Sequence, residues 1–123
     1  MHQPLSGLRV LVLEDEFLIA MDVEQLCRDS GASDVSILRT LGDLDGHADG
    51  NLPFDVAVVD VMLSGNSTLG FARELYRRGK PFIFASGYTE VNDIQRNFPG
   101  VPLIAKPYVG DALVSAIAAA AKR

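Results

Sequence analysis

The stretch that decides the fold is DVAVVD, residues 55–60. Its interior consists of four apolar residues, three of them the β-branched valine, which favours a strand buried on both faces of a sheet. A carboxylate, Asp60, ends the run. The earlier stretch LRVLVL, residues 8–13, is similarly aliphatic and is followed at once by two further acids, Glu14 and Asp15. Nearly continuous apolar runs of this kind are typical of strands covered on both faces, as in parallel sheets, and here acidic residues stand where the runs end.

Further strand-like runs alternate with amphipathic segments along the rest of the chain. In addition to the two strands above, strands are predicted at residues 34–38, 81–85 and 101–105. Apolar residues spaced by three and four positions predict helices over residues 19–27, 69–76, 91–98 and 109–120.

A fifth helix is predicted with less regular features. Residues 41–50 contain three glycines, so any helix there is short and soft. Thr89 is expected to cap the helix over residues 91–98.

Five strands that alternate with five helices, without a linker or repeat, predict an α/β fold: a flavodoxin-like, doubly wound (βα)5 domain with a five-stranded parallel sheet. Residues 1–123 are expected to form this single domain, with no output domain.

Composition and charge limit the classes of function. The chain of 123 residues carries 11 basic and 16 acidic side chains, and its net charge of −5 argues against direct binding of nucleic acid. The N-terminal residues lack the pattern of a signal peptide, and no apolar run approaches the roughly 20 residues of a membrane span. The lone cysteine, Cys27, suits a reducing compartment. These features predict a cytoplasmic protein without a membrane partner.

The predicted topology gathers the reactive side chains in one place. In doubly wound sheets, ligands bind beyond the carboxyl ends of the strands, near the point where the strand order reverses. Each reactive residue has an ordinary explanation by itself: acids favour helix N-termini, hydroxyls and strand-ending aspartates serve turns, and most lysines lie at the surface. What indicates a site is that all of them end predicted strands: Glu14, Asp15, Asp60, Ser86 and Lys106.

Converging carboxylates need a counter-charge. Two of them about 5 Å apart repel by roughly 3 kcal/mol at an effective dielectric constant of about 20. Lys106 offsets part of this repulsion, and Mg²⁺, which prefers carboxylate, carbonyl and water oxygens, offsets more. Such a site suits phosphoryl transfer to Asp60 as nucleophile, with Ser86 donating a hydrogen bond to the phosphoryl group. The two histidines lack metal-ligand spacing, and the sequence contains no glycine-rich phosphate loop.

Four short motifs, taken in order, resemble those of the receiver domain of two-component response regulators. They are VLEDE at residues 12–16, VVD at 58–60, SG at 86–87 and KPY at 106–108. The resemblance covers essentially the whole chain. The complete set in this order is much more specific than any single motif.

This resemblance implies a role for each residue of the site. Asp60 accepts phosphate from the phosphohistidine of a histidine kinase, while Ser86 and Lys106 contact the phosphoryl group. The ligands implied for Mg²⁺ are Asp60, Asp15, the backbone carbonyl of Met62 and, through water, Glu14.

The chain departs from the common receiver pattern at the switch positions. Leu103 stands three positions before the lysine, where the family usually has an aromatic residue. The usual proline and glycine are missing from MLSGN, residues 62–66. Together with FIFASGY, residues 82–88, this pattern is similar to an atypical subgroup with a Phe-Ala-Thr-Gly-Tyr-type motif, whose members are often single-domain and tend to pair with HWE-type kinases. The switch candidates are Ser86, Tyr88 and Leu103.

The expected function is that of a phosphoacceptor receiver that signals through altered protein contacts. Its expected partners are a histidine kinase and a downstream protein or phosphotransfer partner. We expect no enzymatic activity beyond Mg²⁺-dependent autophosphorylation of Asp60 and its hydrolysis. Two alternatives stay open: a pseudo-receiver that only binds partners, and a phosphatase of the haloacid-dehalogenase type. The latter usually needs a second aspartate at the position of Met62.

Overall fold

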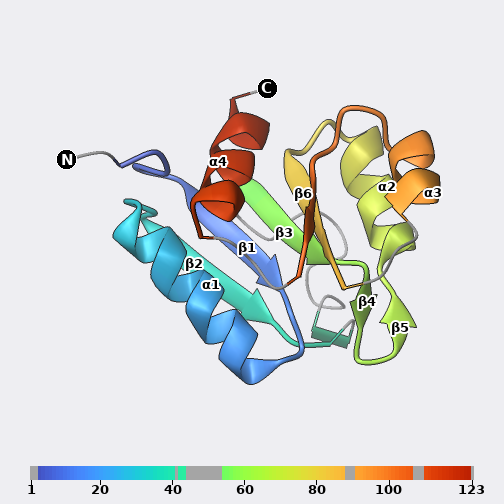
Figure 1. Ribbon diagram of the computed structural model, residues 1–123, viewed down its shortest axis with the longest axis horizontal. Helices are drawn as coiled ribbons and strands as arrows, with labels where there is room; N and C mark the ends of the chain where they lie inside the picture. Colours follow the sequence, from blue (N-terminus) through green and yellow to red (C-terminus); the bar gives the residue numbers. More distant parts are fainter. Residues whose placement is uncertain (1–2, 41, 44–53, 88–90, 107–109, 123) are drawn as a thin grey trace.

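The computed structural model describes residues 3–40, 42–43, 54–87, 91–106 and 110–122 (Figure 1). Its centre is a parallel sheet of five strands with the order β2-β1-β3-β6-β7. This order is the flavodoxin-like one, in which the first two strands exchange places and the later ones follow in sequence. The predicted fold class is therefore confirmed. The strands of this sheet are β1 (Arg9–Leu13), β2 (Asp34–Leu38), β3 (Val56–Asp60), β6 (Phe82–Ser86) and β7 (Leu103–Ala105).

The helices in the described residues cover both faces of the sheet. They are α1 (Phe17–Asp29), α2 (Leu69–Arg77), α3 (Val91–Asn97) and α4 (Gly110–Ala121). α1 and α4 contribute to one hydrophobic cluster, while α2 and α3 contribute to a second cluster on the opposite face (Figure 1). The four strongly predicted helices are thus present, with ends within a few residues of the predicted ones. The soft helix predicted at residues 41–50 lies, apart from 42–43, outside the described residues. Thr89, the predicted cap of the helix over residues 91–98, also lies outside them.

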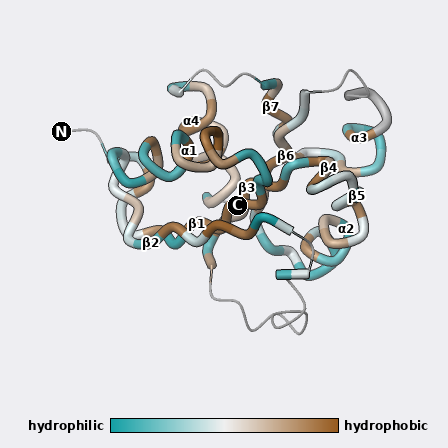
Figure 2. Tube along the Cα trace, turned by 90° about the horizontal axis from the view of Figure 1, so that it is seen from below, coloured by the Kyte–Doolittle hydropathy of each residue, from teal (hydrophilic) through white to brown (hydrophobic). Residues whose placement is uncertain are grey.

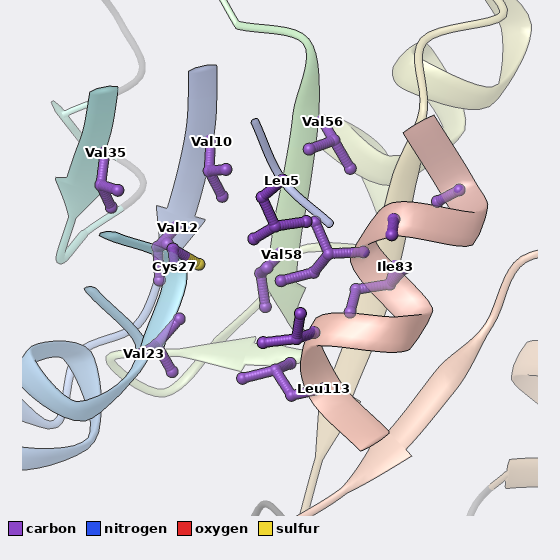
Figure 3. Close-up of a cluster of buried hydrophobic side chains, with 14 of the residues drawn as sticks. Leu5, Val10, Val12, Val23, Cys27, Val35, Val56, Val58, Ile83 and Leu113 are labelled. Carbon is purple, nitrogen blue, oxygen red and sulfur yellow. The ribbon is translucent and has the colours of Figure 1, made fainter. Parts of the chain in front are cut away.

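Strict alternation of side chains makes each central strand hydrophobic on both faces. In β1, Val10 and Val12 face the cluster beneath α1 and α4, whereas Leu11 and Leu13 face the cluster beneath α2 and α3. β3 and β6 alternate in the same way. Figure 2 shows the hydrophobic colour along β1 and β3 at the middle of the molecule, and Figure 3 shows the first cluster around Val58. Burial on both faces explains why the strand sequences are continuous apolar runs.

A small hairpin that the sequence did not predict follows β3. It consists of β4 (Met62–Leu63) and β5 (Asn66–Ser67), which pair in antiparallel fashion. The two turn residues, Ser64 and Gly65, both have positive φ, at 52° and 80°. Two positive φ angles match the right-handed twist of a tight hairpin, and glycine adopts them readily. The fully buried Leu63 anchors the hairpin in the cluster beneath α2 and α3.

No helix in the part of the chain that the structure describes is both long and apolar enough to cross a membrane.

Because α4 packs on the sheet through a single apolar stripe, the residues of that stripe should account for most of what α4 contributes to the free energy of unfolding. Ile117 on α4 is fully buried, and Ile117→Ala should lower the free energy of unfolding by about 2 to 5 kcal/mol. Ser115 lies exposed on the same helix, so Ser115→Ala should change it by less than about 0.5 kcal/mol. Urea unfolding followed by circular dichroism measures both values. Equal effects of the two substitutions would contradict this packing.

Candidate functional site

The candidate residues meet at the carboxyl edge of the sheet. Glu14 follows β1, Asp60 ends β3, Ser86 ends β6 and Lys106 follows β7. The register aligns these ends, since Asp60 lies beside Ala85 on the neighbouring strand. A carboxylate oxygen from each of Glu14, Asp15 and Asp60 lies within 4.8 Å of the other two. The acids that the sequence places on separate segments therefore form one cluster.

Lys106 bridges two of the three carboxylates. Its Nζ lies 2.7 Å from Oε1 of Glu14 and 2.7 Å from Oδ2 of Asp60. The side chains are 15% exposed for Lys106, 1% for Glu14 and 8% for Asp60, so water screens these charges only weakly. The backbone also fixes the lysine, because its N–H donates to the carbonyl of Ser86 at 2.9 Å. One cation is thus held between two nearly buried anions.

The β4–β5 hairpin supplies backbone donors to the same cluster. The N–H of Met62 donates to Oδ1 of Asp60 at 3.3 Å. At the hairpin tip, the N–H of Ser64 donates to Oδ2 of Asp15 at 2.7 Å. These contacts were not predicted, because backbone donors leave no signal in residue type. The only hint in the sequence is the Ser64-Gly65 pair, which is compatible with a tight turn.

Arg39, which follows β2, ties the hairpin tip to the loop after β1. Its guanidinium donates to the backbone carbonyl of Asp15 at 3.3 Å and lies over the ring of Phe17, 5.9 Å from the ring centroid. Its own backbone carbonyl accepts a hydrogen bond from Oγ of Ser64 at 3.1 Å. Asp15 is therefore held from two sides, although it stands outside any strand or helix.

The electrostatics of the cluster show a surplus of negative charge. Burial raises the pKa of the Glu14 carboxyl above its ordinary value, and the charge of Asp60 raises it further. The Lys106 ammonium and the N–H of Glu16, which donates to Oε2 of Glu14 at 3.2 Å, lower this pKa in part. Apart from this contact with the Lys106 ammonium, Oε1 of Glu14 accepts no hydrogen bond within the described residues. A buried carboxylate oxygen is therefore left with spare acceptor capacity.

This donor set is compatible with a divalent metal ion such as Mg²⁺. Three oxygen-bearing side chains converge, one lysine compensates only part of their charge, and hard cations prefer oxygen ligands. Asp15 and Asp60 present carboxylates at this cluster, and Met62 lies next to it through its backbone.

Of the three switch candidates, Ser86 and Leu103 lie among the described residues. Ser86 is buried at the end of β6. Leu103 begins β7 beside Phe84 and is half-buried against the cluster beneath α2 and α3. An aliphatic side chain therefore packs at the position where receiver domains usually have an aromatic one. Tyr88, Pro107 and Tyr108 lie outside the described residues.

Ionisation of Glu14 should make the stability of the chain depend on pH. Because the folded chain holds the Glu14 proton more tightly than the unfolded chain, Glu14 stabilises the fold below its unfolded pKa and loses this contribution as pH rises through its folded pKa. In metal-free buffer, Glu14→Gln should therefore be more stable than the parent chain at about pH 7.5, with the difference shrinking toward about pH 4. Urea unfolding across this range measures the difference, and Glu16→Gln controls for the loss of one exposed charge. A difference that did not vary with pH would contradict this origin.

Comparison with known proteins identifies the fold. No family model and no curated protein match the sequence. Among solved structures, the chain is similar to a response regulator receiver protein from Sinorhizobium medicae, with a TM-score of 0.82 and 18% identity over 94% of this chain and 95% of that one.

Two structures of PhyR share more of the sequence. The PhyR stress response regulator is 28% identical, with a TM-score of 0.66, over 93% of this chain and 45% of that one. A mutant of the anti-anti-sigma factor PhyR from Bartonella quintana is 26% identical, with a TM-score of 0.74, over 94% and 49%. The chain spans about half the length of either PhyR structure. The chain therefore has the fold of a response regulator receiver domain, as its motifs indicated.

Proposed function

We propose that this chain is the phosphoacceptor receiver of a two-component phosphorelay, with Asp60 as the residue that is phosphorylated. The observation that carries the proposal is the position of Asp60 in a receiver fold: its carboxylate lies 2.7 Å from the Lys106 ammonium, within a cluster that includes Glu14 and Asp15. A carboxylate can act as a nucleophile toward phosphorus when nearby cations neutralise the charge of the incoming group.

The proposed reaction transfers a phosphoryl group from a phosphohistidine to Asp60. A carboxylate oxygen of Asp60 forms a bond to phosphorus while the bond from phosphorus to the histidine nitrogen breaks. That nitrogen keeps the electron pair and takes up a proton. Lys106, already paired with Asp60, offsets the charge on the phosphoryl oxygens, and Ser86 at the end of β6 donates a hydrogen bond to one of them.

Mg²⁺ is the metal ion that we propose for the cluster. Asp15, Asp60 and the backbone carbonyl of Met62 would hold it directly, and Glu14 through water. When bound, it supplies positive charge next to the phosphoryl oxygens. The buried surplus of negative charge around Glu14 supports this assignment.

The proposed partners are proteins on both sides of the phosphorelay. Upstream, we propose a histidine kinase of the HWE type, on the basis of the FIFASGY motif at residues 82–88. Downstream, we propose a protein whose binding depends on the phosphorylation state. The similarity to PhyR, described as an anti-anti-sigma factor, makes a regulator of transcription initiation a candidate for this role. Beyond autophosphorylation and hydrolysis of the aspartyl phosphate, no turnover is proposed.

A single phosphorylation assay separates this function from its alternatives. Incubation with Mg²⁺ and a small phosphodonor should add one labile phosphoryl group, detected by intact mass. Asp60→Asn should abolish this addition, because the substitution removes the carboxylate that accepts the phosphoryl group. Asp55→Asn is the matched control, since Asp55 precedes the opposite end of the same strand and pairs with Arg9 instead. No adduct and no response to beryllofluoride would indicate a pseudo-receiver. Repeated turnover of a phosphoester would indicate a phosphatase.

Metal binding provides an independent test. Asp15→Asn removes a charged oxygen ligand and should weaken Mg²⁺ binding by more than about tenfold. Glu16→Gln should leave the affinity nearly unchanged, because the neighbouring Glu16 side chain is exposed and does not belong to the cluster. Isothermal titration calorimetry measures both affinities. Equal losses in the two variants would mean that general charge, and not coordination by Asp15, attracts the ion.

A further inference from the structure

Thr68 occupies the N-cap position of α2 but does not act as an ordinary cap. A threonine there usually has extended backbone angles, and its hydroxyl accepts a hydrogen bond from an N–H in the first turn. Thr68 has φ −97° and ψ 5° and makes no such side-chain bond. Instead, Oγ of Ser67 accepts from the N–H of Leu69 at 3.2 Å. The Thr68 hydroxyl is thus free of the capping role that its sequence position suggests.

The Thr68 hydroxyl is directed at the backbone of the phosphoacceptor. Oγ1 lies 2.5 Å from the carbonyl oxygen of Asp60 and 3.1 Å from that of Val61. A hydroxyl has one proton to donate, so the two carbonyls share it, and the shorter contact is with Asp60. The N–H of Thr68 also donates to the Val61 carbonyl at 3.0 Å. The residue is fully buried, which protects these bonds from water.

These bonds close the base of the β4–β5 hairpin. The chain leaves β3 at Asp60, forms the hairpin and returns at Thr68, so the hydroxyl joins the two ends of the excursion (Figure 1). The enclosed segment carries the N–H of Met62, which donates to Oδ1 of Asp60, and that of Ser64, which donates to Oδ2 of Asp15. A shift at the base would therefore move backbone donors to two of the three carboxylates.

We propose that Thr68 is a positioning residue of the phosphoacceptor site. Its hydroxyl holds the backbone of Asp60 and Val61 so that the Asp60 carboxylate and the Met62 backbone keep the positions that the metal ion and the phosphoryl group require. This inference rests on the proposed function. Thr68 itself touches neither group and acts through the residues that do. Hydrogen-bonded partners of metal ligands commonly contribute a factor of about 10 to 100 to metal affinity.

The test compares two substitutions of Thr68 with a core control. Thr68→Val keeps the shape and removes the hydroxyl, whereas Thr68→Ser keeps the hydroxyl and removes the methyl group. Val23→Ala is the control, because Val23 is equally buried but lies on α1, in the cluster on the opposite face of the sheet. Mg²⁺ affinity is measured by calorimetry, binding of beryllofluoride by fluorine NMR, and stability by thermal unfolding of each chain.

We expect Thr68→Val to weaken binding of Mg²⁺ and beryllofluoride by about tenfold or more, and Thr68→Ser to stay within about twofold of the parent chain. Val23→Ala should lower the melting temperature without weakening the binding of either Mg²⁺ or beryllofluoride. Three results would overturn the proposal: parental binding by the valine chain, equal losses in the serine and valine chains, or a valine chain that does not fold, since the hydroxyl would then serve the fold and not the site. If the parent chain bound neither ligand, the proposed function itself would fail.

Discussion

The ammonium of Lys106 is the contact on which the carboxyl edge of the sheet depends. Its Nζ lies 2.7 Å from Oε1 of Glu14 and 2.7 Å from Oδ2 of Asp60. Both carboxylates are nearly buried, so water cannot take the place of the ammonium. Removing Lys106 would leave two nearly buried carboxylates without their cation, which costs far more than an exposed ion pair contributes. Strand β7 ends immediately before this lysine, and its parallel register with β6 brings the lysine to the end of β3.

Compensation at this edge is incomplete, and the shortfall is itself informative. The raised pKa of Glu14 reflects burial that Lys106 offsets only in part. A chain selected for stability alone would replace such a group with an apolar one, because a well-packed hydrophobic residue is often as stable as a buried ion pair. This surplus of buried negative charge is compatible with a divalent cation, because carboxylate oxygens of Glu14, Asp15 and Asp60 converge at the same place.

The sequence predicted the sheet, the main helices and the residues at the strand ends, because each depends on local patterns of burial. It did not predict the β4–β5 hairpin, whose strands have two residues each and therefore show no periodicity. Its turn places Ser64 at a φ of 52°, which serine rarely adopts. Thr68 was equally hidden, since a threonine before a helix suggests an N-cap, and only the folded chain shows its hydroxyl on the Asp60 carbonyl.

The sequence by itself determined that reactive residues would line one edge of a parallel sheet. Alternation of strands and helices is a local property, and parallel strands necessarily bring their carboxyl ends to the same side. The tertiary structure decided which atoms meet there. Lys106 and Asp60 are 46 positions apart, and Asp15 and Ser64 are 49 apart. Contacts over such separations follow from strand register and from the path of the hairpin, because a shift of one residue would turn each side chain to the other face.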